Sequence, residues 1–511
     1  MREQGEGARR REPSWDEAYV AYVLRPGYEH WQRRYWTFFF ELERAHLVAL
    51  VRAGWLSPSQ AGRIAAGLDR VEKSSLEQEP YRGDVEDLFF AIEQRLRQEV
   101  GEVADNLHLA RSRNDIDVTL YRMDLRRSLL DLHQRMEGLA QALLAQARAH
   151  LHTVMPGYTH GQQAQPTTMA HYLAAVLANV ERSRRRLEST WPEVNASPLG
   201  AAAFTTSGFY IDRRLLAELL GFDGLVRNAY DAVASTDYVM PLLAECSTLA
   251  GTLSRFTADL TFWAANEVAG VRLADAFVQV SSIMPNKRNP VVLEHIRSRL
   301  GRVPGLFQQA CALHANVSFA DINDTEDNLQ PVWHEAEQLL GEATELLARA
   351  VSSLDVDVEV LRRRAREGMS TVTELADTLV REAGLSFRQA HGVVSRLVKL
   401  ARERELAPHR WSPALLDEAA RHELGRSVAL SPAALEEALD PVHFVEVRRT
   451  LGGPAPGEVA AGLDELAEEI AAGRRWREER LDRLEQASRR LAQEATEWER
   501  GNDSRQKMAG E

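Results

Sequence analysis

Residues 279–290 carry the side chains in this chain that are best suited to chemistry. Pro285 and Pro290 rule out a continuous helix here, because proline lacks the amide donor and clashes with the preceding turn. Sequence with helical periodicity flanks the stretch on both sides. We therefore predict a polar loop held by a rigid helical scaffold, an arrangement typical of functional loops. Its hydroxyl, ammonium and amide groups belong to Ser281, Ser282, Lys287 and Asn289.

Three further polar segments interrupt sequence that is otherwise apolar and helical: 107–115, 157–165 and 197–207. Any one of them alone is more typical of a capped turn between helices than of a site. Taken together with 279–290 they favour a site, because helices longer than ~30 residues can carry distant loops to one end of a bundle or to a neighbouring subunit. The first two segments supply Arg111, Ser112, Arg113, Asn114, Thr159, His160 and Gln163.

These groups indicate proton abstraction next to a carboxylate. Guanidinium, ammonium and amide donors bind carboxylates, while hydroxyls and imidazole can move protons. Such a reaction needs a base at the acidic carbon, donors for the enolate-like carboxylate, and an acid for the leaving group. A serine hydrolase is a weaker alternative, since no G-x-S-x-G elbow occurs. No metal-ligand cluster or Gly-rich phosphate loop is present in the sequence, so we expect neither a cofactor nor a metal.

The overall composition is that of a globular protein. Of 511 residues, 44% are hydrophobic and 27% charged, and the net charge of −13 argues against a nucleic-acid or anionic-membrane partner. Cys246 and Cys311 are too few for a disulfide framework or a zinc site. We find no apolar run long enough for a membrane span and no signal-peptide pattern. The cytoplasm is the expected location.

Apolar spacing predicts an all-α fold built on a bundle of long helices. We expect a kink at Pro241 and a structured turn at 155–168. The predicted division is an N-terminal helical domain (1–116), a central bundle (117–354) and a small C-terminal helical domain with a helical extension (355–511). The main helices are expected at about 29–53, 58–71, 84–100, 117–151, 169–190, 230–270, 291–317, 329–354 and 458–499.

The segment SSIMPNKRNP closely resembles the signature loop of the aspartase/fumarase superfamily. Three other segments, LHLARSRNDIDV, GYTHGQQAQPTTMAHYL and SPLGAAAFTTSGFYIDR, resemble those of argininosuccinate lyases in the same order. MSTVTELADTLVREAGLSFRQAH and GGPAPGEV are similar to the C-terminal domain of that branch. The resemblance implies a three-domain, all-α homotetramer whose active sites are each assembled from three subunits. It also implies reversible elimination of fumarate from an N-succinyl amine.

The resemblance implies a role for each matching residue. Ser281 corresponds to the base that takes the Cβ proton, His160 to the acid-side histidine, and Glu294 to its charge partner. Lys287, a catalytic residue in this scheme, holds with Ser282 and Asn289 the carboxylate whose negative charge grows. The remaining substrate-binding residues are Ser112, Arg113, Asn114, Thr159, Gln163 and Met284.

The departures from the argininosuccinate lyase pattern fall mostly on the amine side of the substrate. The family's Tyr, Gln and Lys that recognise the amino-acid product correspond approximately to Ser318, Asn323 and Glu326. Four further family residues, an Asp, a Ser, a His and an Asn, correspond to Phe39, Glu43, Phe89 and Ala91. Each buried polar group left without its partner costs ~1–3 kcal/mol, so these changes are expected to weaken argininosuccinate binding. Alternatively, the alignment shifts across 318–331 and other residues substitute.

Several functions therefore stay open. The chain is expected to act either as an argininosuccinate lyase or on another N-succinyl amine, as ethylenediamine-disuccinate lyase does. A non-catalytic, crystallin-like structural protein is a third alternative, opposed by the retention of Ser281, Lys287, Asn289 and His160. A cycloisomerase or adenylosuccinate lyase is disfavoured by the segments 107–115 and 157–172. The expected partners are the N-succinyl amine, fumarate and further copies of the chain, without nucleic acid or membrane.

Overall fold

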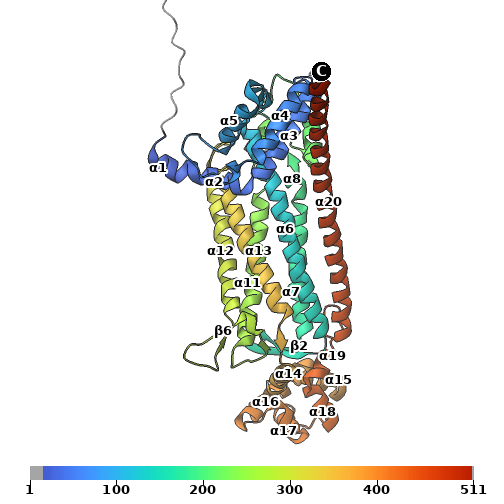
Figure 1. The fold of residues 1–511 in the computed structure, drawn as a ribbon. Helices are drawn as coiled ribbons and strands as arrows, with labels where there is room; N and C mark the ends of the chain where they lie inside the picture. Colours follow the sequence, from blue (N-terminus) through green and yellow to red (C-terminus); the bar gives the residue numbers. More distant parts are fainter. Residues whose placement is uncertain (1–14, 509–511) are drawn as a thin grey trace, which may run out of the picture.

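The computed structural model describes residues 15–508, with side chains up to residue 494. Long helices run side by side through its middle and form an elongated bundle (Figure 1). They pack along a continuous apolar core, as expected for helices with a wide apolar face. The bundle helices are α6 (Arg113–Ala149), α7 (Met169–Ser189), α11 (Met240–Ala264), α12 (Val291–His314) and α13 (Leu329–Ser352). The predicted all-α fold is confirmed.

The N-terminal helices lie at one end of this bundle, which we call the upper end after its place in Figure 1. Ser57 and Gln60 form a reciprocal capping box at the start of α4, as the Ser-Pro sequence suggested. The elements are α1 (Glu17–Tyr19), the π-helical turn η1 (Val20–Leu24), α2 (Arg25–Arg34), α3 (Trp36–Arg52), α4 (Pro58–Glu72), η2 (Ser75–Gln78), α5 (Leu88–Val100) and η3 (Gly101–His108).

Short elements connect the bundle helices at both ends. In residues 15–508 the strands form two-stranded pairs: β1 (Val154–Thr159) with β2 (Gln162–Thr168), β3 (Ala196–Ser197) with β4 (Gly224–Leu225), β5 (Val271–Arg272) with β8 (Asp355–Val356), and β6 (Gln279–Val280) with β7 (Arg288–Asn289). The short helices in these connections are α8 (Trp191–Val194), α9 (Arg213–Leu219), α10 (Ala229–Ala234) and η4 (Asp275–Phe277).

A group of short helices lies at the other, lower end of the bundle (Figure 1). Residues between 375 and 439 bury a hydrophobic cluster separate from the main core. The elements are α14 (Val358–Glu367), α15 (Val372–Ala383), α16 (Phe387–Glu403), η5 (Pro408–Arg410), α17 (Pro413–Leu424), α18 (Pro432–Leu439) and α19 (Pro441–Glu446). The three-domain boundaries at 116 and 354 stay a prediction.

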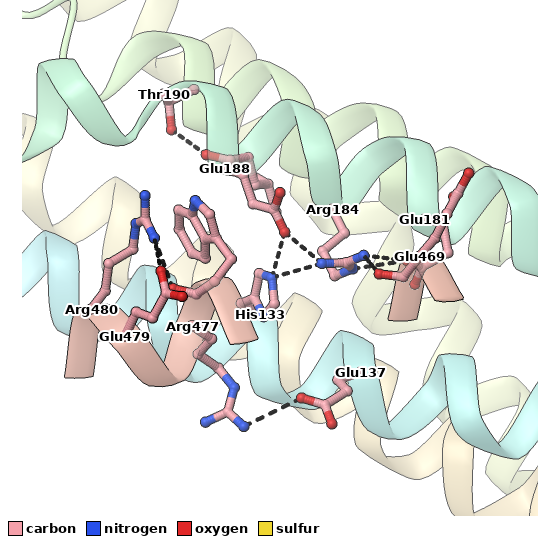
Figure 2. Close-up of polar contacts among 12 residues, drawn as sticks. His133, Glu137, Glu181, Arg184, Glu188, Thr190, Glu469, Arg477, Glu479 and Arg480 are labelled. Atoms are coloured by element: carbon pink, nitrogen blue, oxygen red, sulfur yellow. Dashed lines mark hydrogen bonds and ion pairs between the residues drawn. The ribbon is translucent and has the colours of Figure 1, made fainter. Parts of the chain in front are cut away.

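Helix α20 (Pro456–Met508) runs back from the lower end along the bundle to the N-terminal helices (Figure 1). Figure 2 shows the polar contacts that hold it: Arg184 of α7 donates to the Glu469 carbonyl at 2.8 Å, and Arg477 donates to Glu137 of α6 at 3.3 Å. Gly473 permits this close approach, because a Cβ there would stand 1.2 Å from Arg184 Nη1. The helical extension predicted at 458–499 is thus a wall of the main core.

Two predicted helices differ from the structure. The helix predicted at 29–53 is interrupted at Tyr35, which lies between α2 and α3 with φ −113°. The single helix predicted at 230–270 is instead α10 followed by α11, and the predicted kink at Pro241 is wrong. Pro241 lies in the first turn of α11, where no intrahelical donor is lost. None of the helices in residues 15–508 has the length and apolar character that crossing a membrane requires.

Candidate active site

The loop at 279–290 is closed at its base by the β6–β7 pair, in which Gln279 faces Asn289 and Val280 faces Arg288. Arg288 fixes this base, because its guanidinium donates to the Leu273 carbonyl at 3.1 Å and forms an ion pair with Asp275. The rest of the loop is presented to solvent. Its exposed residues include Ser282, Met284 and Lys287, and the Ile283 side chain is 84% exposed.

The Ser281 hydroxyl lies inside the turn of this loop. Its Oγ accepts hydrogen bonds from the backbone amides of Ile283 at 3.3 Å and Met284 at 3.0 Å. Amide dipoles directed at an oxygen stabilise negative charge on it. The loop therefore supplies part of the environment that a serine base requires. No contact among the described residues joins Lys287 Nζ to this oxygen.

His160 lies at the tip of the β1–β2 hairpin, which replaces the structured turn expected from the sequence. His160 and Gly161 have φ values of +53° and +71°, the left-handed pair that a tight two-residue hairpin turn requires. Thr159 and His160 are exposed, whereas Gln163 is tied down by donating to the Arg364 carbonyl of α14 at 2.8 Å. The hairpin thus presents an imidazole on a rigid support.

The hairpin and the 279–290 loop both lie at the lower end of the bundle (Figure 1). Glu294 follows the loop in the first turn of α12 and is exposed. The structure therefore places most of the predicted site at this end: Thr159, His160, Gln163, Ser281, Ser282, Met284, Lys287, Asn289 and Glu294. They lie on the β1–β2 hairpin, on the 279–290 loop and at the start of α12.

The other two polar segments, 107–115 and 197–207, meet at the upper end. Asp115 joins them: it accepts from the amide of Ser112 at 2.9 Å and from the amides of Gly200 and Ala202 at 2.8 and 2.9 Å. Burial raises the pKa of Asp115 to about 6, although these amides oppose the shift. Asn114 adds a bond to the Ala203 carbonyl at 3.3 Å.

A buried ion pair stabilises the upper end. Arg111 donates to both oxygens of Glu43 at 2.7 Å, and both side chains are less than 5% exposed. A bidentate guanidinium–carboxylate pair fixes orientation as well as charge. Next to it His46 contacts the Leu109 carbonyl through Nε2 at 2.8 Å. The start of α6, where Ser112 to Asn114 lie, is therefore held rigidly.

Arg113 is surrounded by carboxyl groups that sequence reasoning did not assign to the site. It pairs with Asp87 at 2.7 Å and Glu86 at 3.4 Å. Further carboxyl groups interact with one another beside it; they belong to Asp117, Asp321, Glu326 and Asp327. We call these four residues together with Asp87 the acidic cluster. The dense acidic run in ADINDTEDN, at 320–328, was the available signal.

The two halves of the predicted site are thus far apart within one chain. Helix α6 alone separates them, since its 37 residues span roughly 55 Å at ~1.5 Å per residue. Ser112, Arg113 and Asn114 stand at one end, and the proton-transfer candidates Ser281 and His160 stand at the other. One chain does not bring these residues together.

Comparisons with known proteins identify the family of the chain. A family model described as "Lyase" matches residues 30–305, and one described as "Argininosuccinate lyase C-terminal" matches residues 369–446. Argininosuccinate lyase 2 of Agrobacterium fabrum is 38% identical over 445 residues, which cover 86% of this chain and 88% of that protein. Argininosuccinate lyase of Methanoculleus marisnigri is 37% identical over 458 residues, covering 89% and 91%.

The solved structures that are similar to this chain include two of one lyase. EDDS lyase, in complex with formate, superposes with a TM-score of 0.86 at 30% identity and covers 92% of this chain and 93% of its own. A variant of EDDS lyase with bound fumarate gives the same values. The 3-carboxy-cis,cis-muconate lactonizing enzyme of Pseudomonas putida, at 22% identity and a TM-score of 0.71, shares the fold. The chain therefore belongs to the argininosuccinate lyase branch of the aspartase/fumarase superfamily, and it is a carbon–nitrogen lyase.

Proposed function

We propose that this lyase releases fumarate from an N-succinyl amine at sites assembled from several copies of the chain in a homotetramer. The observation that carries the proposal is the separation of Ser112–Asn114 from Ser281 and His160 by the length of α6. The lower end carries the proposed proton-transfer groups and part of the carboxylate donors, but the remaining donors, Ser112, Arg113 and Asn114, lie at the upper end. A complete site therefore requires the upper end of one chain to meet the lower end of another.

In the proposed reaction Ser281 removes the proton from Cβ of the succinyl group. The carbanion electrons form the carbon–carbon double bond of fumarate as the carbon–nitrogen bond breaks, and its electron pair leaves with the nitrogen. His160, with Glu294 as its charge partner, delivers the proton to that nitrogen. The carboxylate that gains charge is held by Ser282, Lys287 and Asn289, while Ser112, Arg113, Asn114 and Thr159 hold the rest of the fumarate half, with Gln163 and Met284 at its edge.

The hydrogen bonds at Ser281 support its role as the base. In ordinary water a serine hydroxyl ionises far too weakly, but two amides already face this oxygen. Closure of the exposed loop onto substrate would exclude water and strengthen their effect. The loop then acts as both lid and base.

The relatives named argininosuccinate lyase support argininosuccinate as a substrate, and with it a place in arginine biosynthesis in the cytoplasm. The test is an absorbance assay for fumarate with argininosuccinate as substrate, combined with light scattering to measure the oligomeric state. We expect fumarate release by a tetramer and its loss in Ser281→Ala. Fumarate release by a monomer would contradict the shared site. A complete lack of turnover at high protein concentration, with argininosuccinate and with every amine tested in the reverse direction, would favour a structural protein.

A further inference from the structure

The acidic cluster at the upper end contains more carboxyl groups than cations among the described residues. Its members are Asp87, Asp117, Asp321, Glu326 and Asp327, and Arg113 is the cation that interacts with Asp87, Asp117 and Asp321. Arg113 is already engaged by Asp87 at 2.7 Å. Among the described residues, five carboxyl groups thus lie beside one guanidinium, and they cannot all be ionised unless a further cation binds.

Glu326 is the buried member of this cluster. Its side chain lies in a residue that is 7% exposed, and Oε2 has no hydrogen-bond partner among the described residues. Burial, together with the nearby Asp321, Asp117 and Asp327, raises the pKa of Glu326 well above its usual value. Asp117 Oδ1 is likewise buried without a partner. The Glu326 and Asp321 carboxyl groups hydrogen-bond to each other, so they share a proton as long as no other donor is present. Because buried carboxyl oxygens without donors are costly, a cation from outside the chain would stabilise the ionised forms of these groups.

The arrangement of the carboxyl groups indicates which kind of cation would bind to the acidic cluster. Asp321 and Asp327 are exposed and Glu326 is buried, so the carboxyl groups extend from the surface inward. Asp327 is held in place by the Tyr121 hydroxyl, which donates to it at 3.0 Å. No three of the described His, Cys, Asp and Glu side chains are positioned to hold a metal ion. Carboxyl groups arranged in this way suit an organic ammonium or guanidinium, which offers several N–H donors.

The cluster also lies where the amine half of a substrate would be. Asp117 lies near the start of α6, three residues after Asn114, and Arg113 interacts with it. A succinyl group held by Ser112–Asn114 would direct its nitrogen substituent toward neighbouring side chains, of which the acidic cluster is a large part. An α-carboxylate on that substituent would meet repulsion, whereas a positive charge would meet attraction.

We propose that the acidic cluster binds a positively charged group at the far end of the amine half, so that this lyase favours a cationic amine that carries no carboxylate. This inference rests on the proposed fumarate-releasing function and specifies its substrate class. Arginine and agmatine form a matched pair of probes. Both present a guanidinium to fumarate and both carry a second amino group, but agmatine lacks the carboxylate.

The experiment measures the reverse reaction, addition of each amine to fumarate, by loss of fumarate absorbance. We expect kcat/KM for agmatine to exceed that for arginine at least tenfold. Glu326→Gln and Asp321→Asn should lower kcat/KM for agmatine, mainly through KM, and reduce the agmatine preference severalfold. Asp321 is exposed, so its variant tests the proposal even if Glu326→Gln folds poorly. Asp324→Asn, in the same segment but outside the cluster, is the matched control and should leave both values unchanged.

The outcomes separate this inference from the function beneath it. Equal or faster addition of arginine, or a preference that survives both variants, overturns the inference while leaving the fumarate chemistry in place. Failure to consume fumarate with agmatine, arginine and ammonia alike overturns the proposed function itself. A readout independent of turnover is the thermal shift: agmatine should raise the melting temperature of the wild-type protein more than arginine does, and this difference should shrink in Glu326→Gln.

Discussion

The polar residues at the two ends of the bundle differ in burial and in hydrogen bonding. At the upper end, Arg111, Glu43 and Asp115 are buried and hydrogen-bonded, so that the start of α6 is fixed. At the lower end, His160 and Lys287 project into solvent with few partners in their own chain. The polar residues at the upper end are thus held by their own chain. Those at the lower end are available to contact another molecule. This contrast teaches that one subunit buries and fixes the polar residues at one end while it leaves those at the other end exposed.

The largest expected effect comes from a substitution at the lower end. Ser281→Ala should lower kcat by about 10³-fold, in the range typical for loss of a general base. Its melting temperature should stay that of the wild type, because the loop is exposed and the hydroxyl supports no core contact. Fumarate absorbance and a thermal melt provide the two measurements. Near-normal turnover of Ser281→Ala alongside an inactive Lys287→Ala would show that the base is assigned to the wrong residue.

Mixing two inactive variants tests whether the ends meet across subunits. Ser281→Ala disables the lower end and Asn114→Ala the upper end, so hybrid tetramers should contain some sites with neither substitution. After the two proteins are unfolded together and refolded, we expect measurable fumarate release, against almost none for either variant refolded alone. Activity that does not rise above the two separate controls would indicate that each site draws on one chain.

Breaking the buried ion pair at the upper end should lower the stability of the protein. Arg111→Met leaves Glu43 buried without its partner, and removal of one member of such a pair costs about 3–5 kcal/mol. Urea unfolding measures this loss. Arg349→Met removes an exposed partner of Glu345 and serves as the control, with little change expected. Similar stability for the two variants would argue that the upper end is not rigidly held.

The smallest effect concerns pH. Burial and neighbouring carboxyl groups raise the folded-state pKa of Glu326, so the unfolded chain releases this proton first and stability falls as pH rises above the unfolded pKa. Glu326→Gln removes that loss. Its melting temperature should exceed that of the wild type by a few degrees near pH 8 and approach it near pH 4, where the carboxyl is protonated in both states. A constant difference across this range would contradict an unneutralised carboxyl.

Much of the fold was predictable because helical periodicity is a local property. The start of α7 near Met169 and the end of α5 before Gly101 follow from apolar spacing and capping residues. Pro241 was misread, because sequence alone does not show whether a proline lies inside a helix or in its first turn. Similarly, the left-handed backbone at His160 depends on strand pairing, which spacing does not reveal.

The chemical groups of the site were also predictable, but their arrangement was not. Residue types and the family resemblance identified Ser281, His160 and Ser112–Asn114 as candidates, and these roles stay predictions. The direction in which each helix runs decides which loops share an end, and that depends on packing across the whole bundle. Glu326 was named from the sequence as a departure on the amine side, but its association with Asp87 and Asp117 was missed for the same reason: these residues are far apart in sequence and meet through tertiary packing.

The return of α20 has a consequence for synthesis. Leu484 and Leu491, near the end of the chain, are buried in the main core, and Ser488 donates to Glu41 of α3 at 2.7 Å. Helices α3 and α4 therefore lack one wall of their core until α20 has emerged from the ribosome. A nascent or prematurely terminated chain exposes that apolar groove, which is the kind of surface that chaperones and proteases recognise. The core around α3 and α4 is thus complete only after translation has passed α20.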